Sequence, residues 1–473
     1  MFFLLLLALI QLGCNSNIEN PSESLSIEKI KKRGKLIAIT GFNAYSYFIY
    51  KGKPMGFEYE LLKRFSKRLG VDLEIKVVKN INEMFTNLEN GDGDLIAFNL
   101  TITNERKKNF DFTHYINTTQ QVLVQRKPKN WRRMTMDQIS DSLIRNPIDL
   151  EYKTVYTRKG SVYKTRLENL SEEIGGHIEI IEAQDTVSIE DLIENVATGE
   201  IDYTVSDENV AELNLAFYPN IDIETYISFP QKIAWVVRKG SNDFLEELNT
   251  WIEEFKKDLD FYVIYDRYYK YRNYYKARRS SKYFLSDGGG ISQYDKLIQK
   301  YADSINWDWR LLASMIYQES NFKPDTKSWA GAVGLMQLLP ETGNAHGAED
   351  LLDPEKNIRA GANYIKWLDN FWAKYVEDKD ERVKFILASY NIGFGHIEDA
   401  RRLAEKYGGN PNVWSENVAD FLLKKSKPKY YNDEVVKNGY SNGRETVAYV
   451  KKIMQRYDRY VQFVGLNPNK KEI

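Results

Sequence analysis

The spacing of apolar residues changes part-way along the chain, and this change limits the folds that the chain can adopt. Between residues 35 and about 265, short apolar runs such as "KLIAIT" (35–40) alternate with amphipathic segments such as "GFEYELLKRFSKRLG" (56–70). Short apolar runs are typical of buried strands, whereas apolar residues spaced three and four apart indicate helices. The alternation predicts an α/β domain with a largely parallel sheet.

From residue 292 onward, the patterned segments predict helices. Examples are "DWRLLASMIYQES" (308–320), for which Asp308 is a candidate N-cap, and "RETVAYVKKIMQRYDRYV" (444–461). Because 473 residues exceed what one typical core accommodates, we expect this helical part to be a separate domain.

Two similar runs, "QQVLVQRK" (120–127) and "KIAWVVRKG" (232–240), bracket the middle of the α/β part. They predict a two-lobed domain, in which the chain leaves one lobe, builds a second and returns. The basic, aromatic segment that follows could contact an anionic polymer or lipid headgroups, although a solvated connecting helix is the favoured interpretation. The predicted boundaries are 30–267 for the α/β domain (lobe 1, 30–124 and 234–267; lobe 2, 125–233), 268–291 for the linker and 292–465 for the helical domain.

The charge balance argues against one class of partner. The chain has 66 basic and 67 acidic residues, which gives a formal net charge of -1. Nucleic-acid-binding domains carry a strongly basic face. We therefore expect no nucleic-acid partner.

The N-terminus carries "MFFLLLLALIQLG" followed by Cys14, the single cysteine of the chain. The apolar run is too short to span a bilayer but suits the core of a signal peptide. An apolar run that ends in Gly-Cys resembles a bacterial lipoprotein signal. The resemblance implies a signal over residues 1–14, a lipid on Cys14, a tether over residues 15–29 and anchoring at the periplasmic face of the outer membrane. A plain cleaved signal with an incidental cysteine is the alternative.

The first half carries "TITNERKKNFDFT" (101–113) directly after the strand pattern "DLIAFNL". Ligands of α/β folds bind at the carboxyl ends of strands, and an arginine fork pairs with a carboxylate. Thr101 and Arg106 are therefore candidate ligand residues. For Arg106 taken alone, a surface salt bridge would be the better interpretation.

This segment resembles the periplasmic solute-binding proteins of amino-acid uptake systems. The resemblance implies that Thr101 and Arg106 clamp a carboxylate, that the amides of Gly160 and Ser161 face it, and that Asp207 receives an ammonium group. The expected ligand is an amino acid or a small muropeptide, and the module is more plausible as a sensor than as a transporter component. Asn99 stands where the family often has a small residue.

Glu319 lies at the end of a helix pattern in the second half. Leu312, Met315, Ile316 and Glu319 fall at i, i+3, i+4 and i+7, so Glu319 shares the stripe that faces the core. Apolar surroundings disfavour the charged carboxylate and raise its pKa, as a general acid working near neutral pH requires. Taken alone, an inward glutamate is more often structural.

Four ordered motifs surround this glutamate: "QESNFKPDTKSWAGAVGLMQLLP" (318–340), "LLDPEKNIRAGANYI" (351–365), "ASYNIGFGHI" (388–397) and "RETVAYVKKI" (444–453). Together they resemble the lytic transglycosylases of the goose-lysozyme-like type, which cleave peptidoglycan glycan strands. The resemblance implies an all-α (α+β), lysozyme-like catalytic domain with Glu319 as acid and base. The implied glycan-binding residues are Ser328, Met336, Gln337, Tyr390, Asn391 and Tyr449.

Most glycosidases use two carboxylates, but Asp325, Glu341 and Asp353 match no catalytic position of the family. The family chemistry needs one, because the C6 hydroxyl of N-acetylmuramic acid attacks C1 and yields a 1,6-anhydro product. A nucleophile within the same molecule has a large proximity advantage over water. No metal or cofactor is required. The alternatives are a hydrolytic muramidase and a catalytically inactive cell-wall scaffold, and the first domain is either a regulator or a passive spacer.

Overall fold

The computed structural model describes residues 25–184, 187–281, 284–285 and 290–464. Cys14 and most of the predicted tether lie outside these ranges. Helix α1 (Ile27–Arg33) begins inside the segment 15–29 that we expected as tether, with Ser26 as its N-cap. Within the described residues, no helix combines the length and the apolar character needed to cross a bilayer.

The chain forms two compact units. Of the described residues, one unit comprises those within 25–47 and 56–276, and the other comprises those within 48–55 and 277–464. The first contains two α/β lobes and the second is mainly helical, which confirms the predicted multidomain fold class. The helices of the first unit that follow α1 are α2 (Phe57–Leu69), α3 (Ile81–Glu89), α4 (Arg106–Asn109), α5 (Met136–Asp141), α6 (Tyr163–Ile174), α7 (Ile189–Thr198), α8 (Glu208–Asn214), α9 (Asn242–Phe255) and α10 (Leu259–Tyr269).

The first lobe is built on a sheet whose central strands match the apolar runs of the sequence. In spatial order its strands are β4 (Asp72–Val77), β1 (Lys35–Thr40), β5 (Leu95–Thr101), β13 (Gln231–Arg238) and β6 (Phe110–Phe112), with β7 (Asn117–Thr119) also paired to β13. β4, β1 and β5 run parallel, and the returning strand β13 runs antiparallel to β5. Gly70 caps the C-terminus of helix α2, and its φ of 72° is the left-handed conformation that glycine adopts readily.

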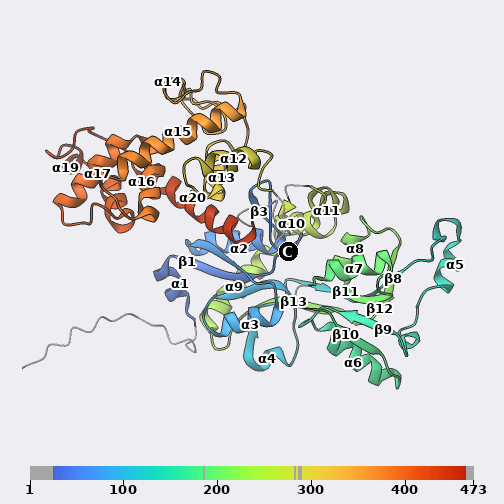
Figure 1. Cartoon of the computed structure of the whole chain (residues 1–473). Coiled ribbons are helices and arrows are strands. Elements are labelled where there is room, and N and C mark those ends of the chain that lie inside the picture. The colour runs from blue at the N-terminus through green and yellow to red at the C-terminus, as the bar shows by residue number, and fades with distance from the viewer. Residues whose placement is uncertain (1–24, 185–186, 282–283, 286–289, 465–473) are drawn as a thin grey trace, which may run out of the picture. The chain divides into compact units, whose positions relative to one another are not determined.

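The second lobe has its own sheet, with helices on both faces. Its strands in spatial order are β10 (Glu179–Glu182), β9 (Thr154–Thr157), β11 (Tyr203–Asp207), β8 (Gln121–Arg126) and β12 (Ile221–Tyr226). Figure 1 shows α7 and α8 on one side of this sheet and α6 on the other. The chain already enters this sheet at Gln121, a few residues before the expected boundary at 125, because β8 pairs with β11 and β12.

The second unit confirms the helical prediction from residue 292 onward. Asp308 caps α13 by accepting from the Arg310 amide, and Asp353 caps α15 by accepting from the Lys356 amide. The Asp308 cap confirms the sequence-based expectation. The helices are α12 (Asp295–Asp303), α13 (Trp309–Ser320), α14 (Pro340–Ala345), α15 (Pro354–Trp372), α16 (Lys379–Ile392), α17 (Phe394–Lys406), α18 (Ala419–Lys424), α19 (Pro428–Tyr431) and α20 (Arg444–Phe463).

A hairpin from the N-terminal half of the sequence belongs to the second unit. Strands β2 (Phe48–Tyr50) and β3 (Lys53–Met55) pair with each other, and β2 also pairs with β14 (Phe284–Leu285). The turn of the hairpin lies against α20, where the Tyr460 hydroxyl donates to the Gly52 carbonyl at 3.1 Å. The expected linker 268–291 therefore includes β14 and the helix α11 (Arg272–Arg279).

A buried ion pair holds the loop before α20 against α17. Asp399 accepts from Lys425 Nζ at 2.7 Å and from the Lys437 and Asn438 amides at 2.8 Å each. Both charged side chains are 0% exposed. Removing one partner of a buried pair leaves the other charge uncompensated.

We therefore expect Asp399→Ala to lower the free energy of unfolding by about 3–5 kcal/mol, since Lys425 loses its partner inside the core. Glu398→Ala, one residue away and 3.7 Å from Arg402, is the matched control. A partly exposed pair contributes up to about 1 kcal/mol. Denaturant unfolding of both variants measures the difference, and equal midpoints for the two would contradict this role of the pair.

Candidate active site

Glu319 lies in the last turn of α13. Leu312, Met315 and Ile316 on the same stripe are 0% exposed, so the predicted inward face of this helix is confirmed. Two hydrogen bonds hold α13 against α20. Ser314 Oγ donates to the Ile453 carbonyl at 2.8 Å, and Arg456 donates to the Ser314 carbonyl at 3.1 Å.

The surroundings of Glu319 favour its neutral form. Burial raises the pKa of Glu319 from 4.5 to about 7, against the opposing effect of a hydrogen bond from Tyr449. The Tyr449 hydroxyl donates to Glu319 Oε1. Tyr390 lies close enough that Glu319 contributes, after burial, to raising the pKa of the Tyr390 hydroxyl. Among the described residues, no second carboxylate contributes to the shift of the Glu319 pKa.

The "GAVGLMQ" segment (331–337) forms a tight turn that is part of the site. Gly334 has a φ of 85°, and a Cβ there would lie 2.2 Å from Asn357 Nδ2. The side chain of Asn357, on α15, accepts from the Met336 amide at 2.8 Å and donates to the Val333 and Leu351 carbonyls. Asn357 was not singled out from the sequence, although it lies inside the second motif.

Tyr390 contacts this turn through Met336. The Tyr390 hydroxyl donates to the Met336 carbonyl at 2.8 Å, which links α16 to the turn. Met336 is fully buried, and a Cβ on Gly361 of α15 would lie 2.2 Å from its sulfur. Met336 thus packs beneath the turn, as its apolar side chain indicated.

The other sequence-predicted residues make hydrogen bonds within the protein. Ser328 Oγ accepts from the Ala332 amide at 3.0 Å, and Gln337 Nε2 donates to the Thr326 and Gly334 carbonyls. Asn391 follows Tyr390 and accepts from Thr446 Oγ1, three residues before Tyr449 on α20. The turn, α16 and α20 thereby meet around the end of α13. Thr446 was missed because a threonine at the start of a helix pattern gives no distinct signal.

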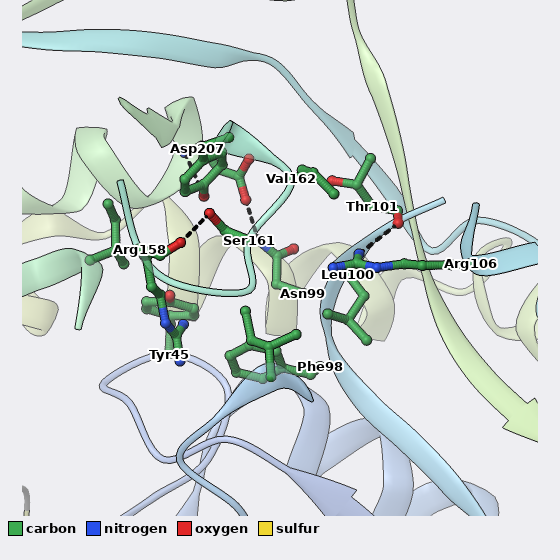
Figure 2. A pocket seen from close by; sticks show the side chains of 13 residues that line it. Tyr45, Phe98, Asn99, Leu100, Thr101, Arg106, Arg158, Ser161, Val162 and Asp207 are labelled. Carbon is green, nitrogen blue, oxygen red and sulfur yellow. Dashed lines mark hydrogen bonds between the residues drawn. The ribbon is translucent and has the colours of Figure 1, made fainter. Parts of the chain in front are cut away.

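A second candidate site lies between the two lobes of the first unit. Arg106, the first residue of α4, donates to the Thr101 carbonyl at 3.0 Å and to the Gly160 carbonyl at 3.4 Å. Burial lowers the pKa of Arg106 to about 10. Figure 2 shows Arg106 beside Thr101 at one end of the pocket. The enclosed cavity between Arg106 and Asp207 has a volume of about 30 Å³, which is too small for an amino acid. A larger, open cavity of about 790 Å³ adjoins it and shares Thr101, Arg106 and Ser161.

Asp207 lies at the other end of this pocket. Burial raises the pKa of Asp207 to about 7, and Asn99 Nδ2 donates to Asp207 Oδ2 at 2.8 Å (Figure 2). Asp207 Oδ1 is buried without a hydrogen-bond partner in the described residues. Asn99, which departs from the solute-binding family's usual small residue, thus occupies one of the two oxygens that would receive an ammonium group.

The loop at Gly160 and Ser161 differs in detail from the sequence-based expectation. The Ser161 amide and Oγ both donate to the Arg158 carbonyl, at 3.2 and 2.6 Å. The Ser161 amide therefore closes a local turn in this conformation. Arg158 and Tyr45 also line the pocket and were missed, because nothing in the sequence assigned either of them a ligand contact.

Comparisons with known proteins match both halves of the chain. The model of the bacterial extracellular solute-binding proteins, family 3, matches residues 36–271, and the model of the transglycosylase SLT domain matches residues 296–413. Holo ArgBP from T. maritima, a solved structure, is similar with 26% identity and a TM-score of 0.41, over 50% of this chain and 98% of that one.

Curated relatives are similar along nearly the whole length. The membrane-bound lytic murein transglycosylase F of Desulfosudis oleivorans is 38% identical over 433 residues, which cover 92% of this chain and 91% of that protein. The protein of the same name from Pseudomonas putida is 33% identical, over 93% of this chain and 87% of its own length. The chain therefore belongs to the family of the membrane-bound lytic murein transglycosylase F.

Proposed function

We propose that this chain cleaves the β-1,4 bond between N-acetylmuramic acid and N-acetylglucosamine in peptidoglycan without hydrolysis, with Glu319 as acid and base. The observation that carries this proposal is a partly buried carboxyl whose pKa is about 7. A group with that pKa is both protonated and deprotonated in useful amounts near neutral pH, so one side chain can serve both proton transfers.

In the first step, Glu319 donates its proton to the glycosidic oxygen, and the bond from that oxygen to C1 breaks. The 2-acetamido group of N-acetylmuramic acid stabilises the positive charge that develops at C1. In the second step, the C6 hydroxyl of the same sugar attacks C1 and gives its proton to the Glu319 carboxylate. The product is a 1,6-anhydro sugar, the acid is regenerated and no water is consumed.

The turn and its neighbours have a positioning role in this proposal. Ser328 and Gln337 lie on the loop that follows α13, and Asn391 lies on α16 beside Tyr390. Their polar groups suit the N-acetyl and hydroxyl groups of the sugars. Orienting the C6 hydroxyl toward C1 brings the proximity advantage of an intramolecular nucleophile.

Exchanging the acid for an amide tests the catalytic role. We expect Glu319→Gln to lower turnover of isolated sacculi by about 100-fold or more, because the amide can neither donate nor accept the proton. Glu341→Gln, at the exposed start of α14, is the control and is expected to keep wild-type turnover. Mass spectrometry of the wild-type products should show anhydro ends. Reducing ends would identify a hydrolytic muramidase, and unchanged turnover in Glu319→Gln would rule out this site.

The Tyr449 hydrogen bond provides a test by pH. Because the acid must be protonated, kcat/KM is expected to fall as the pH rises through about 7. The hydrogen bond favours the carboxylate and lowers the pKa of Glu319, so Tyr449→Phe should raise that pKa and move the falling limb to higher pH. A pH profile of kcat/KM for both proteins measures this shift. An unmoved or lowered limb in the variant would contradict the role of Glu319 as the acid.

We also propose that the first unit binds an amino acid or a small muropeptide and that this binding alters turnover. Support comes from a guanidinium and a carboxylate at opposite ends of the pocket, which suit the two charges of an amino acid. Tyr45, which lines the pocket, precedes by three residues the hairpin that starts at Phe48 and packs with the helical unit. Membrane association is part of the same proposal, with lipid-modified Cys14 as the anchor.

Removing the acidic end of the pocket tests ligand recognition. We expect Asp207→Ala to weaken binding of amino acids or muropeptides at least about tenfold, because the ammonium group loses its buried partner. Asp202→Ala is the control, since the Asp202 side chain is 76% exposed. Calorimetric titration of the full chain with single amino acids and with muropeptides identifies the ligand class. Equal affinities for wild type and Asp207→Ala would contradict this assignment, and unchanged turnover at saturating ligand would leave the domain as a spacer.

A further inference from the structure

Four aromatic side chains form a row along one face of α15 and the turn that follows it. Tyr364, Trp367 and Phe371 fall at i, i+3 and i+7 on the helix, and Tyr375 lies three residues beyond its end. Helical periodicity therefore puts them on one side. Successive ring centroids are 6.1, 6.1 and 5.8 Å apart, and the first two pairs are stacked with interplanar angles of 23° and 19°. We call these four residues the aromatic row.

The row lies at the surface although its rings are apolar. Trp367 is 42% exposed and Tyr375 is 39% exposed. On the opposite side of the same helix, Leu368 and Trp372 are fully buried, and the indole of Trp372 donates to Ser389 Oγ. The helix thus has its fully buried contacts on that side. On the row side, Phe394 of α17 packs against Trp367 and Phe371, and the Arg401 guanidinium lies over the Tyr375 ring. Tyr364 and Phe371 are half-buried, so the four rings present a partly exposed aromatic surface, which is a candidate for a binding surface.

The row begins at the site that contains Glu319. The ring of Tyr364 lies 5.2 Å from that of Tyr390, centroid to centroid. Tyr390 is the residue that bonds the Met336 carbonyl and whose pKa responds to Glu319. From Tyr390, the rings of Tyr364, Trp367, Phe371 and Tyr375 follow one another as successive ring contacts.

We propose that the aromatic row binds the glycan strand beyond the sugars at the cleavage site. β-1,4-linked pyranoses present faces of C–H groups, and such faces stack on the flat, electron-rich faces of aromatic rings. A strand of repeated sugars fits a row of repeated rings, whereas a single small ligand would need one ring. The proposal rests on the proposed function, because the strand that occupies the row is the substrate of Glu319.

The aromatic row should contribute to binding of the strand and not to the chemical step. Rings that make the same contacts with the substrate and with the transition state lower KM and leave kcat unchanged, and we expect the aromatic row to act in this way. They contribute only to strands long enough to reach them. Short fragments that occupy the cleavage site alone should not respond to the row.

The test uses the full chain with Trp367→Leu and Tyr375→Leu, which keep apolar bulk but remove the ring face. The substrates are long glycan strands, with and without their peptides, and a peptide-free tetrasaccharide of the same repeat. We expect each variant to raise KM for long strands about 3- to 10-fold with unchanged kcat, and to leave kcat/KM for the tetrasaccharide at the wild-type value. Tyr407, another aromatic residue of the same unit, is 40% exposed, so Tyr407→Leu is the matched control. It should keep the wild-type KM and kcat for every substrate.

Three outcomes would overturn the proposal. These are wild-type KM values for long strands in both variants, equal losses on long and short substrates, and losses that appear only with peptide-bearing strands, which would make the row a peptide site. Binding of long strands to Glu319→Gln, with and without Trp367→Leu, gives the same answer without turnover. If the wild-type chain binds long strands but does not cleave them, the proposed function is wrong. The affinities of Glu319→Gln with and without Trp367→Leu then still show whether the aromatic row binds the strand.

Discussion

The chemistry proposed for this protein depends on keeping water away from one carboxyl group. Glu319 lies in the last turn of a helix on which Leu312, Met315 and Ile316 are fully buried, and burial is the main reason that its pKa rises to about 7. The hydrogen bond from Tyr449 favours the carboxylate and so lowers the pKa of Glu319, against the effect of burial. The balance of these two effects gives a group that can give up a proton and take one back within one reaction cycle.

The rest of the helical unit supports that balance. α20 fixes α13 through Ser314 and Arg456 and carries Tyr449, while Asn357 holds the turn that faces Tyr390. The aromatic row then extends from Tyr390 along α15. In this account the buried acid cleaves the strand, the polar turn orients it and the exposed rings hold it. The acid, the turn and the rings all belong to the one helical unit.

The sequence predicted the elements better than their partners. Strands β1 and β5 and the Asp308 cap follow from local patterns that tertiary contacts do not override. The hairpin at 48–55 was not predictable, because strand patterns do not specify a partner more than 200 positions away such as β14. The hydrogen bond from Asn99 to Asp207 was missed for the same reason, since it joins residues from two lobes.

The most direct measurement is the titration of Glu319 itself in the full chain. Carbon-13 NMR of carboxyl-labelled glutamate, with Glu319→Gln to assign the resonance, gives its pKa without substrate. The account predicts a midpoint near 7, well above the usual value of 4.5. A midpoint at the usual value would mean that the group is ionised throughout the neutral range, and it would contradict the claim that this single residue acts as the acid.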